Sequence, residues 1–274
     1  MNILCFGAHP DDAEWYAGGS LIYWSSHGHK VYAISLTNGN IGHHKLDKET
    51  LAKVRKKEAE ESARRGGYNS IVLDYPDGEL EPSIEARKDV VRIIRDLHAD
   101  VVITHRPVDY HPDHRACGIL IQDAVFLVTV PNFVPEFPAL PQSPICLYMM
   151  DMFKKPQPFS PDFAVDVSEF MEKKWDVLDA MSSQMYEWLP YLDHQLTEVP
   201  IEPGKRKEWL KSRWEGLFRL PAIVFGNSFQ SELADYKGRF EFVEFFELSE
   251  YGRKPSKSEL ETLFNLWRLQ ESLI

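Results

Sequence analysis

Short apolar runs alternate with longer amphipathic stretches through the first half of the chain. Apolar runs of this length that end at turn residues are typical of buried strands. Stretches with apolar residues three and four positions apart are typical of helices. The pattern predicts strands at 2–7, 30–36, 70–75 and 100–104, and helices at 12–27, 49–65, 84–98 and 113–128.

Regular alternation of strands and helices predicts a particular fold class. Short strands rich in Val and Ile that alternate with helices form mostly parallel sheets with helices on both faces. We therefore expect a doubly wound, Rossmann-like α/β fold with the common strand order 3-2-1-4. In that order the first and fourth strands are neighbours, and ligands bind outside their carboxyl ends. The loops after Gly7 and Thr104 are thus the first places to look for a site.

The second half has a weaker pattern. Residues 130–161 contain eight prolines and should be loop or extended chain. Beyond them we expect strands at 163–167 and 240–246, and helices at 168–185 and 258–269. The stretch 187–220, which contains three tryptophans, is interpreted as an inserted helical segment. We expect one domain over 1–274, with a core at 1–184 and a partly helical extension at 185–274 that completes it.

Two clusters of imidazoles and carboxylates lie in the loops that follow the first and fourth predicted strands. The first is His9-Pro10-Asp11-Asp12, and the second is His111-Pro112-Asp113-His114. One such cluster alone is usually a turn, in which Pro sets the backbone and Asp caps the next helix. Two clusters at adjacent strand ends instead favour a metal or hydrolytic site. Two His and one carboxylate suit a catalytic zinc, and they also match the ligand set of non-haem Fe(II).

Other polar residues near these loops have plainer interpretations. His43 and His44 lie in a loop and could overhang the site, although adjacent His residues are more often solvated. Cys117 is better explained as a buried structural residue than as a ligand. His105 either supports the site or simply ends its strand. The Trp residues of the second half could stack on a sugar ring, although core packing is the better explanation for most of them. No glycine-rich nucleotide motif and no Gly-x-Ser-x-Gly elbow is present in the sequence.

Composition narrows the class of protein. The 274 residues carry a net charge of −11, which disfavours nucleic acid and anionic membranes as partners. Three cysteines form no paired framework, which suits a reducing compartment. We see no signal peptide and no apolar stretch of membrane-spanning length, so we expect a cytoplasmic protein. The oligomeric state is open, and a homo-oligomer is compatible with the sequence.

These motifs together resemble the PIG-L/LmbE-type metal-dependent deacetylases. The sequence Ala-His-Pro-Asp-Asp follows the first strand, and His-Pro-Asp-His follows the fourth. Further similarities are Thr-Asn-Gly at 37–39, Arg55 with Glu58, Asp-Gly at 77–78, and Asp-Val-Ser at 166–168 followed by Lys174 and Ser-Gln at 183–184. The resemblance covers roughly 1–184 and thins beyond. One departure is Ala13, where many members have Glu.

The resemblance implies a role for each matching residue. It implies His9, Asp12 and His114 as metal ligands, with zinc the expected metal and Fe²⁺ or another divalent ion as alternatives. Asp11 would be the general base, while His111 and Asp113 would form a charged pair facing the substrate. Arg55 would contact the sugar or its aglycone, the competing interpretation being a surface ion pair with Glu58.

The expected activity is hydrolysis of an N-acetyl amide on an amino sugar or its conjugate. An amide needs an activated water and a protonated leaving nitrogen, so a metal beside a free carboxylate fits the chemistry. An amidase acting on a non-sugar or thiol-conjugate amide is the alternative enzyme. A non-catalytic metal-binding relic is a further alternative, which the presence of a base such as Asp11 disfavours.

Overall fold

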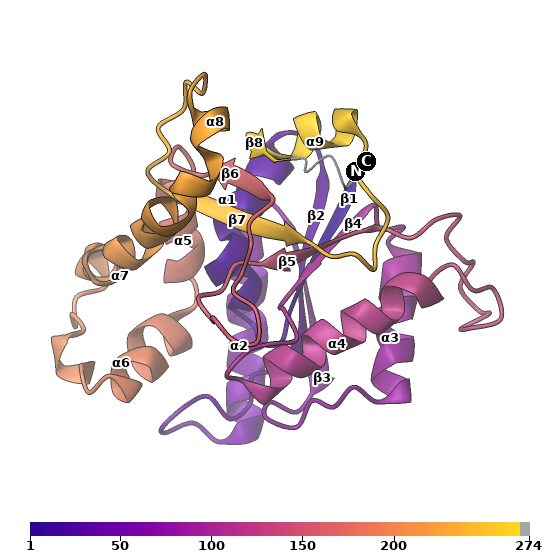
Figure 1. The fold of residues 1–274 in the computed structure, drawn as a ribbon. Helices are drawn as coiled ribbons and strands as arrows, with labels where there is room; N and C mark the ends of the chain where they lie inside the picture. Colours follow the sequence, from indigo (N-terminus) through magenta and orange to yellow (C-terminus); the bar gives the residue numbers. More distant parts are fainter. Residues whose placement is uncertain (269–274) are drawn as a thin grey trace.

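The computed structural model describes residues 1–268, and both halves of the chain contribute strands to one eight-stranded sheet (Figure 1). The strand order is β3-β2-β1-β4-β5-β7-β6-β8. The first five strands in this order are parallel, whereas β7 is antiparallel to β5 and β6, and β8 is antiparallel to β6. The strands are β1 (Asn2–Gly7), β2 (Lys30–Thr37), β3 (Asn69–Tyr75), β4 (Val101–Thr104), β5 (Ile145–Met149), β6 (Phe163–Asp166), β7 (Val243–Leu248) and β8 (Leu266–Trp267).

Helices cover both faces of this sheet. The helices α1 (Asp12–Ser26), α2 (Lys48–Gly66) and α5 (Met171–Asp179) bury their apolar residues in one core, and α3 (Ile84–Asp96) and α4 (Pro112–Leu127) bury theirs in the other (Figure 1). The remaining helices are η1 (Ser183–Trp188), α6 (Leu189–Leu192), η2 (Leu196–Glu198), α7 (Pro203–Phe225), η3 (Gly226–Phe229), α8 (Gln230–Leu233) and α9 (Lys257–Leu263). Within residues 1–268, no helix combines the length and apolar character needed to cross a bilayer.

The predicted fold class and the strand order 3-2-1-4 are confirmed. In the first half the predicted elements lie within about two residues of the observed ones. Two of these helices begin at capping residues. Asp47 and Ser83 accept hydrogen bonds from backbone N–H groups in the first turns of α2 and α3, which fixes where the helices start. The left-handed Gly67 ends α2, as expected of a glycine after a helix.

The proline-rich segment 130–161 contains a strand that we did not predict. All five residues of β5 are buried, and they pair with β4 inside the sheet. The loop that leads to β5 is organised by a buried guanidinium. Arg95 donates hydrogen bonds to six backbone carbonyls, those of residues 127, 128, 130, 133, 134 and 137. The high proline content therefore led us to expect loop or extended chain where the structure has an ordered loop and a buried strand.

Three predicted elements of the second half need correction. The helix expected at 168–185 is α5, which ends at Asp179 and is followed by the π-helix η1. The strand expected at 240–246 is displaced to β7. The helix expected at 258–269 is the shorter α9, after which the chain pairs with β6 as β8, and residue 269 lies outside the described residues.

Helix α1, whose first turn carries the Asp-Asp pair, is held by a buried ion pair. Glu244 on β7 accepts hydrogen bonds from the backbone N–H groups of Gly19 and Ser20, at 2.9 and 2.7 Å. Lys174 on α5 donates to Glu244 at 2.7 Å and to the carbonyl of Trp15 at 2.9 Å. A Cβ at Gly19 would lie 2.6 Å from Val167, so glycine permits this close approach. The pair therefore fixes α1 against the second half of the chain.

We expect Glu244→Gln to destabilise the fold by about 3–5 kcal/mol, because it leaves the buried Lys174 ammonium without its counter-charge. Urea unfolding measures this loss. The control is Glu241→Gln, which removes an exposed ion-pair partner of Arg219 and Arg239 and should change stability little. Equal effects of the two substitutions would contradict a structural role for the buried pair.

Candidate metal centre

A tight turn after β1 brings the two ends of the first cluster together. The backbone N–H groups of Asp11 and Asp12 both donate to the carbonyl of His9, and Asp12 Oδ2 accepts from the N–H of His9 at 2.8 Å. A Cβ at Gly7 would lie 2.6 Å from Asp12 Cβ, so only glycine lets Asp12 fold back over the strand end. The turn thus points one imidazole and one carboxylate in the same direction.

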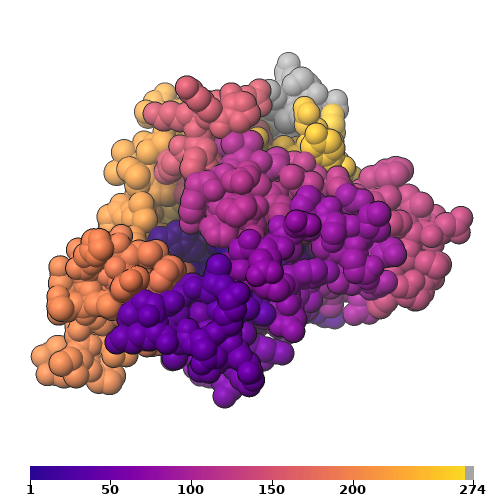
Figure 2. Space-filling model, turned by 90° about the horizontal axis from the view of Figure 1, so that it is seen from below, coloured from indigo at the N-terminus to yellow at the C-terminus, as the bar shows by residue number. Residues whose placement is uncertain are grey.

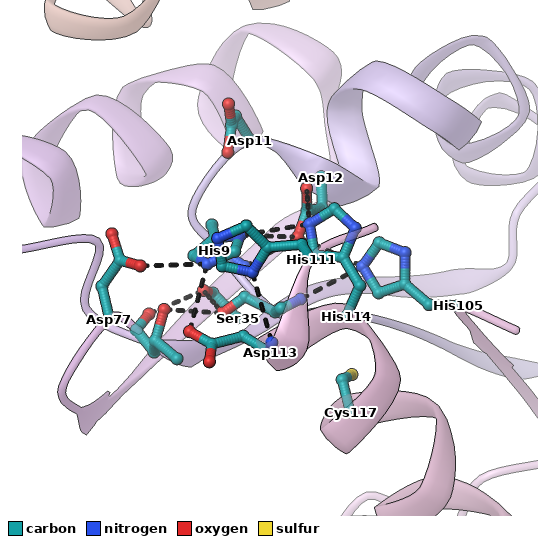
Figure 3. Close-up of polar contacts among 12 residues, drawn as sticks. His9, Asp11, Asp12, Ser35, Asp77, His105, His111, Asp113, His114 and Cys117 are labelled. Atoms are coloured by element: carbon teal, nitrogen blue, oxygen red, sulfur yellow. Dashed lines mark hydrogen bonds and ion pairs between the residues drawn. The ribbon is translucent and has the colours of Figure 1, made fainter. Parts of the chain in front are cut away.

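Helix α4 brings His114 to the same place. Its Nε2 lies 3.3 Å from Asp12 Oδ1 and 3.3 Å from His9 Nδ1, and His9 Nδ1 lies 3.4 Å from Asp12 Oδ2. Metal–ligand bonds of about 2.0–2.1 Å in a tetrahedral site separate neighbouring ligand atoms by about 3.3–3.4 Å. The three side chains predicted as ligands therefore lie together, with His9 contacting Oδ2 and His114 contacting Oδ1 of Asp12 (Figure 3).

The titration behaviour of these groups reflects the same crowding. Burial opposes a charge on both imidazoles, but neighbouring carboxylates outweigh it. They raise the pKa of His9 well above its usual value and that of His114 to about 9. Burial raises the pKa of Asp12, yet His114 and His105 outweigh burial and lower it well below its usual value. The centre thus holds an ionised carboxylate between imidazoles that attract positive charge.

The outward-facing nitrogens of both imidazoles meet further carboxylates. His9 Nε2 lies 3.1 Å from Asp77 Oδ1 and 3.3 Å from Asp113 Oδ2. His114 Nδ1 lies 3.1 Å from Asp109 Oδ1, although the angle falls short of a hydrogen bond. Carboxylates in this position orient imidazole ligands and increase their basicity. The nitrogens that face each other beside Asp12 are therefore His9 Nδ1 and His114 Nε2 (Figure 3).

Asp11 stands apart from the imidazoles and is nearly buried (Figure 3). Its Oδ1 lies 3.3 Å from Nη2 of Arg55, whose Nη1 donates to Gln184 Oε1. Burial raises the pKa of Asp11, and the guanidinium opposes that shift. Arg55, which we expected to contact the substrate, lines the cavity at this centre; it is 3% exposed, and its observed partners are protein groups. The competing ion pair with Glu58 is not observed, since Glu58 instead accepts from Ser183.

The charged pair expected between His111 and Asp113 does not form. The carboxylate of Asp113 accepts hydrogen bonds from the backbone N–H groups of Gly78 and Leu80, at 2.6 and 3.3 Å, as well as contacting His9. His111 caps α4, and its Nδ1 accepts from the N–H of Asp113 at 3.2 Å. Burial, with the neighbouring His9 and His114, lowers the pKa of His111. Because Nδ1 accepts this hydrogen bond, Nε2–H is the donor that the ring can offer to a neighbour.

Other His and Asp combinations also crowd the centre. Among residues 1–268, three groups bring one ligand atom each within 4.8 Å of one another, namely His9-His111-His114, Asp12-His105-His114 and His9-Asp77-Asp113. The set His9-Asp12-His114 is not one of them, and its two imidazoles contact different oxygens of Asp12. His105 stacks on His114 with ring centroids 4.1 Å apart and lies 3.1 Å from Asp12, so it supports the site. Cys117 is buried, and burial raises its pKa to about 12, which agrees with a structural thiol rather than a ligand.

These groups open onto a cavity of about 580 Å³, which we call the site cavity. Its polar floor includes His9, Asp11 and His111, and aromatic residues from distant segments form its walls: Trp15, Tyr16, Tyr110, Trp188 and Trp214. Figure 2 shows this hollow, with the indigo N-terminal segment at its floor between orange and magenta segments. The loop with His43 reaches one rim, where His43 bonds to Glu187 and His44 stacks on Tyr191.

Sequence reasoning missed several contributors. Asp109 was not singled out, although an acid two residues before His111 could have signalled a partner for a nearby imidazole. Asp77 was noted only as a turn residue. Tyr16 gave no signal beyond its place one helical turn after Asp12. Trp188 was placed with the core tryptophans, yet it lines the site cavity.

Comparison with known proteins places this geometry in a family. Residues 4–125 match the PIG-L family model, described as GlcNAc-PI de-N-acetylase. The diacetylchitobiose deacetylase of Thermococcus kodakarensis is 31% identical over 202 residues, which cover 70% of this chain and 74% of the relative. The 4-oxalmesaconate hydratase of Pseudomonas putida is 23% identical, with 84% of this chain and 88% of the relative covered.

A solved structure extends the similarity beyond the matched segment. The N,N'-diacetylchitobiose deacetylase from Pyrococcus horikoshii superposes with a TM-score of 0.70 at 26% identity, covering 91% of this chain and 84% of the other. The likeness thus extends well beyond residues 4–125. On the strength of these matches, the chain belongs to the PIG-L family, whose members among its relatives include deacetylases.

Proposed function

We propose that this protein is a zinc-dependent hydrolase that removes the acetyl group from the amide nitrogen of an amino sugar or its conjugate. The observation that carries the proposal is the triangle formed by His9 Nδ1, His114 Nε2 and the carboxylate of Asp12 at the floor of the site cavity. The two nitrogens lie 3.3 Å apart, and they lie 3.4 Å from Oδ2 and 3.3 Å from Oδ1 of Asp12, respectively. Family membership supports the reaction, since relatives bear the names diacetylchitobiose deacetylase and N-acetyl-α-D-glucosaminyl L-malate deacetylase. Products would be acetate and a free amine.

The donor set fits a divalent cation. Two imidazole nitrogens and one carboxylate oxygen form a three-ligand set that leaves further positions open, as in catalytic zinc sites. Asp77, Asp113 and Asp109 would hold the two imidazoles in register through their other nitrogens. A divalent cation in such a site polarises a carbonyl and makes water acidic enough to act as a nucleophile near neutral pH.

Asp11 is the residue that we assign to proton transfer. It lines the site cavity beside Asp12 but contributes no atom to the triangle, so its carboxylate is free to act as a base. It would accept a proton from the attacking water and return it to the departing nitrogen. His111 also faces the cavity, and its Nε2–H would donate a hydrogen bond to the oxyanion of the tetrahedral intermediate. Asp113 would act through His9 and not through His111.

We assign Arg55 the role of positioning Asp11. Its guanidinium bridges Asp11 and Gln184, which ties the base on α1 to η1 across the cavity. An ionic hydrogen bond of this kind restricts the carboxylate to one orientation. The small exposed area of Arg55 leaves little of it for a substrate to touch.

His114→Ala should yield a folded protein that binds zinc much more weakly, because one of three ligands is lost. Metal content after dialysis against a mild chelator measures the effect. His111→Ala is the matched control, since His111 lies in a competing group with His9 and His114 but is not in the proposed set. Loss of zinc from His111→Ala with retention in His114→Ala would overturn the ligand assignment.

Asp11→Asn should keep the metal and lose roughly 10²–10⁴-fold in kcat, the usual contribution of general acid–base catalysis. Asn preserves the shape of the side chain but cannot accept the proton. Release of free amine from N-acetylglucosamine and its conjugates measures turnover, with a non-sugar N-acetyl amide tested in parallel. A wild-type rate in the variant would remove Asp11 from the mechanism, and hydrolysis of the non-sugar amide alone would replace the proposed substrate class.

Arg55→Ala should lower kcat by roughly tenfold or more while changing KM less, because it loosens the base and leaves substrate contacts in place. Steady-state kinetics separate the two constants. Arg64→Ala, an exposed arginine on the same helix, is the control and should leave both constants unchanged. A large rise in KM at constant kcat would instead make Arg55 a substrate contact.

A further inference from the structure

A second cavity of about 220 Å³ lies beside the site cavity, and we call it the apolar cavity. Most of its lining is aromatic or aliphatic. The side chains come from segments far apart in the sequence: α1, the chain after β5, α5, α7 and β7. Among those that form its surface are Met152, Phe153, Leu217, Phe218 and Phe242.

The two cavities share walls. Trp15 and Tyr16 on α1 line both of them. Helix α7 runs past both as well, since Trp214 lines the site cavity and Phe218, one turn later, lines the apolar cavity. The ring of Trp15 lies between these two, 4.9 Å from Trp214 and 5.0 Å from Phe218. The two cavities therefore adjoin along the aromatic side chains of Trp15 and Tyr16.

A second pair of aromatic side chains also connects the linings of the two cavities. The ring of Tyr110, which lines the site cavity, lies 6.3 Å from that of Phe153, which lines the apolar cavity. Tyr110 immediately precedes His111, so this wall belongs to the loop that carries the second cluster. A molecule whose amide lies at the metal centre thus has an apolar chamber that adjoins the site cavity.

The charged groups of the apolar cavity neutralise one another. Lys174 is paired with Glu244 at 2.7 Å, and its ammonium also lies 4.3 Å from the ring centre of Phe218. Asp151 accepts two hydrogen bonds from Arg106, at 2.6 and 2.8 Å. A charged occupant would meet no free counter-charge here and would pay its full desolvation cost. The cavity therefore selects an uncharged, apolar group.

We infer that the apolar cavity binds an uncharged apolar substituent of the substrate while the amide lies at the metal centre. This inference rests on the proposed function, which it deepens by naming a substrate class. A cavity of about 150 Å³ lined by apolar side chains takes a benzene molecule, so the larger volume here suits a phenyl ring or a short alkyl chain. That group could be carried on the amine side, as an apolar aglycone, or on the acyl side.

The family match supports a role in specificity and not in the shared chemistry. It covers 4–125 and includes both His-Asp clusters. Of the residues that line the apolar cavity, only Trp15 and Tyr16 fall inside that range, and all the others lie at 150 or beyond. The chamber is thus built almost wholly from the part of the chain that the family model leaves out.

The test compares substrates that differ in one apolar group. The first pair is phenyl and methyl glycosides of N-acetylglucosamine, and the second is N-hexanoyl- and N-acetylglucosamine. We expect a kcat/KM preference of roughly tenfold or more for the apolar member of one pair, since even one methylene in a fitted pocket gives about 10–200-fold discrimination. The pair that shows the preference identifies the side of the amide that enters the cavity.

Leu217→Glu places a carboxylate at the mouth of the apolar cavity and should abolish that preference while leaving the rate with the smaller substrate unchanged. Met152→Glu tests the opposite wall. Both residues are 44% exposed, so the folded state should tolerate the substitutions. Leu220→Glu is the matched control on α7, because Leu220 is 36% exposed and lines neither cavity.

Probe binding separates failure of this inference from failure of the proposed function. The uncharged dye N-phenyl-1-naphthylamine should fluoresce with wild type and Leu220→Glu, and much less with Leu217→Glu or Met152→Glu. Absence of amide hydrolysis with every substrate would contradict the proposed function, and equal probe binding by all variants would then overturn the cavity as well. Hydrolysis without preference in either pair would overturn the inference alone.

Discussion

Charge balance at the carboxyl ends of β1 and β4 is the constraint on which the site depends. Five carboxylates converge there, those of Asp11, Asp12, Asp77, Asp109 and Asp113. Within residues 1–268, Arg55 is the one arginine or lysine paired with any of them. Carboxylates taken out of water without compensation cost several kcal/mol each. The remaining positive charge must come from protons on His9 and His114 or from a cation between them, and the spacing of their nitrogens suits the cation.

The sequence was sufficient to predict where the site lies because its position follows from topology. Parallel strands that are neighbours at a switch point must present their following loops together, so the two His-Asp clusters could be placed side by side from the sequence. The family resemblance then singled out His9, Asp12 and His114 within them. The direction of Asp113 could not be predicted in this way. Its carboxylate accepts hydrogen bonds from the N–H groups of residues 78 and 80, which belong to the loop after β3. No local sequence pattern indicates that this loop contacts α4.

The second half was less predictable for a different physical reason. Its strands are short, and they complete a sheet whose other members are far away in sequence, so their burial depends on tertiary contacts. β5 is fully buried although the segment around it is rich in proline, because Arg95 satisfies the carbonyls of the preceding loop. The cavity walls from η1 and α7 likewise become visible only when these helices are placed against α1.

This division between halves also separates chemistry from specificity. One relative is named a deacetylase and another a hydratase, and both align over most of this chain. A metal beside a carboxylate base activates water in the same way whichever electrophile the water attacks. The electrophile must then be selected by the walls around the centre, which here include Gln184, Trp188 and Trp214 from the second half.

Helix α1 carries residues of both the proposed reaction centre and the lining of the apolar cavity. Its N-terminal turn carries Asp12, with Asp11 as its cap, and the next turn carries Trp15 and Tyr16, which form the wall between the cavities. The third turn is clamped by Glu244, and the partner of Glu244, Lys174, lines the apolar cavity. A helix is rigid over such a short distance, and packed side chains transmit strain. Trp15 and Tyr16, which would contact an apolar substituent, are therefore held in fixed register with the proposed base and metal ligand at the start of the same helix, whereas Leu217 and Met152 line the apolar cavity from other segments.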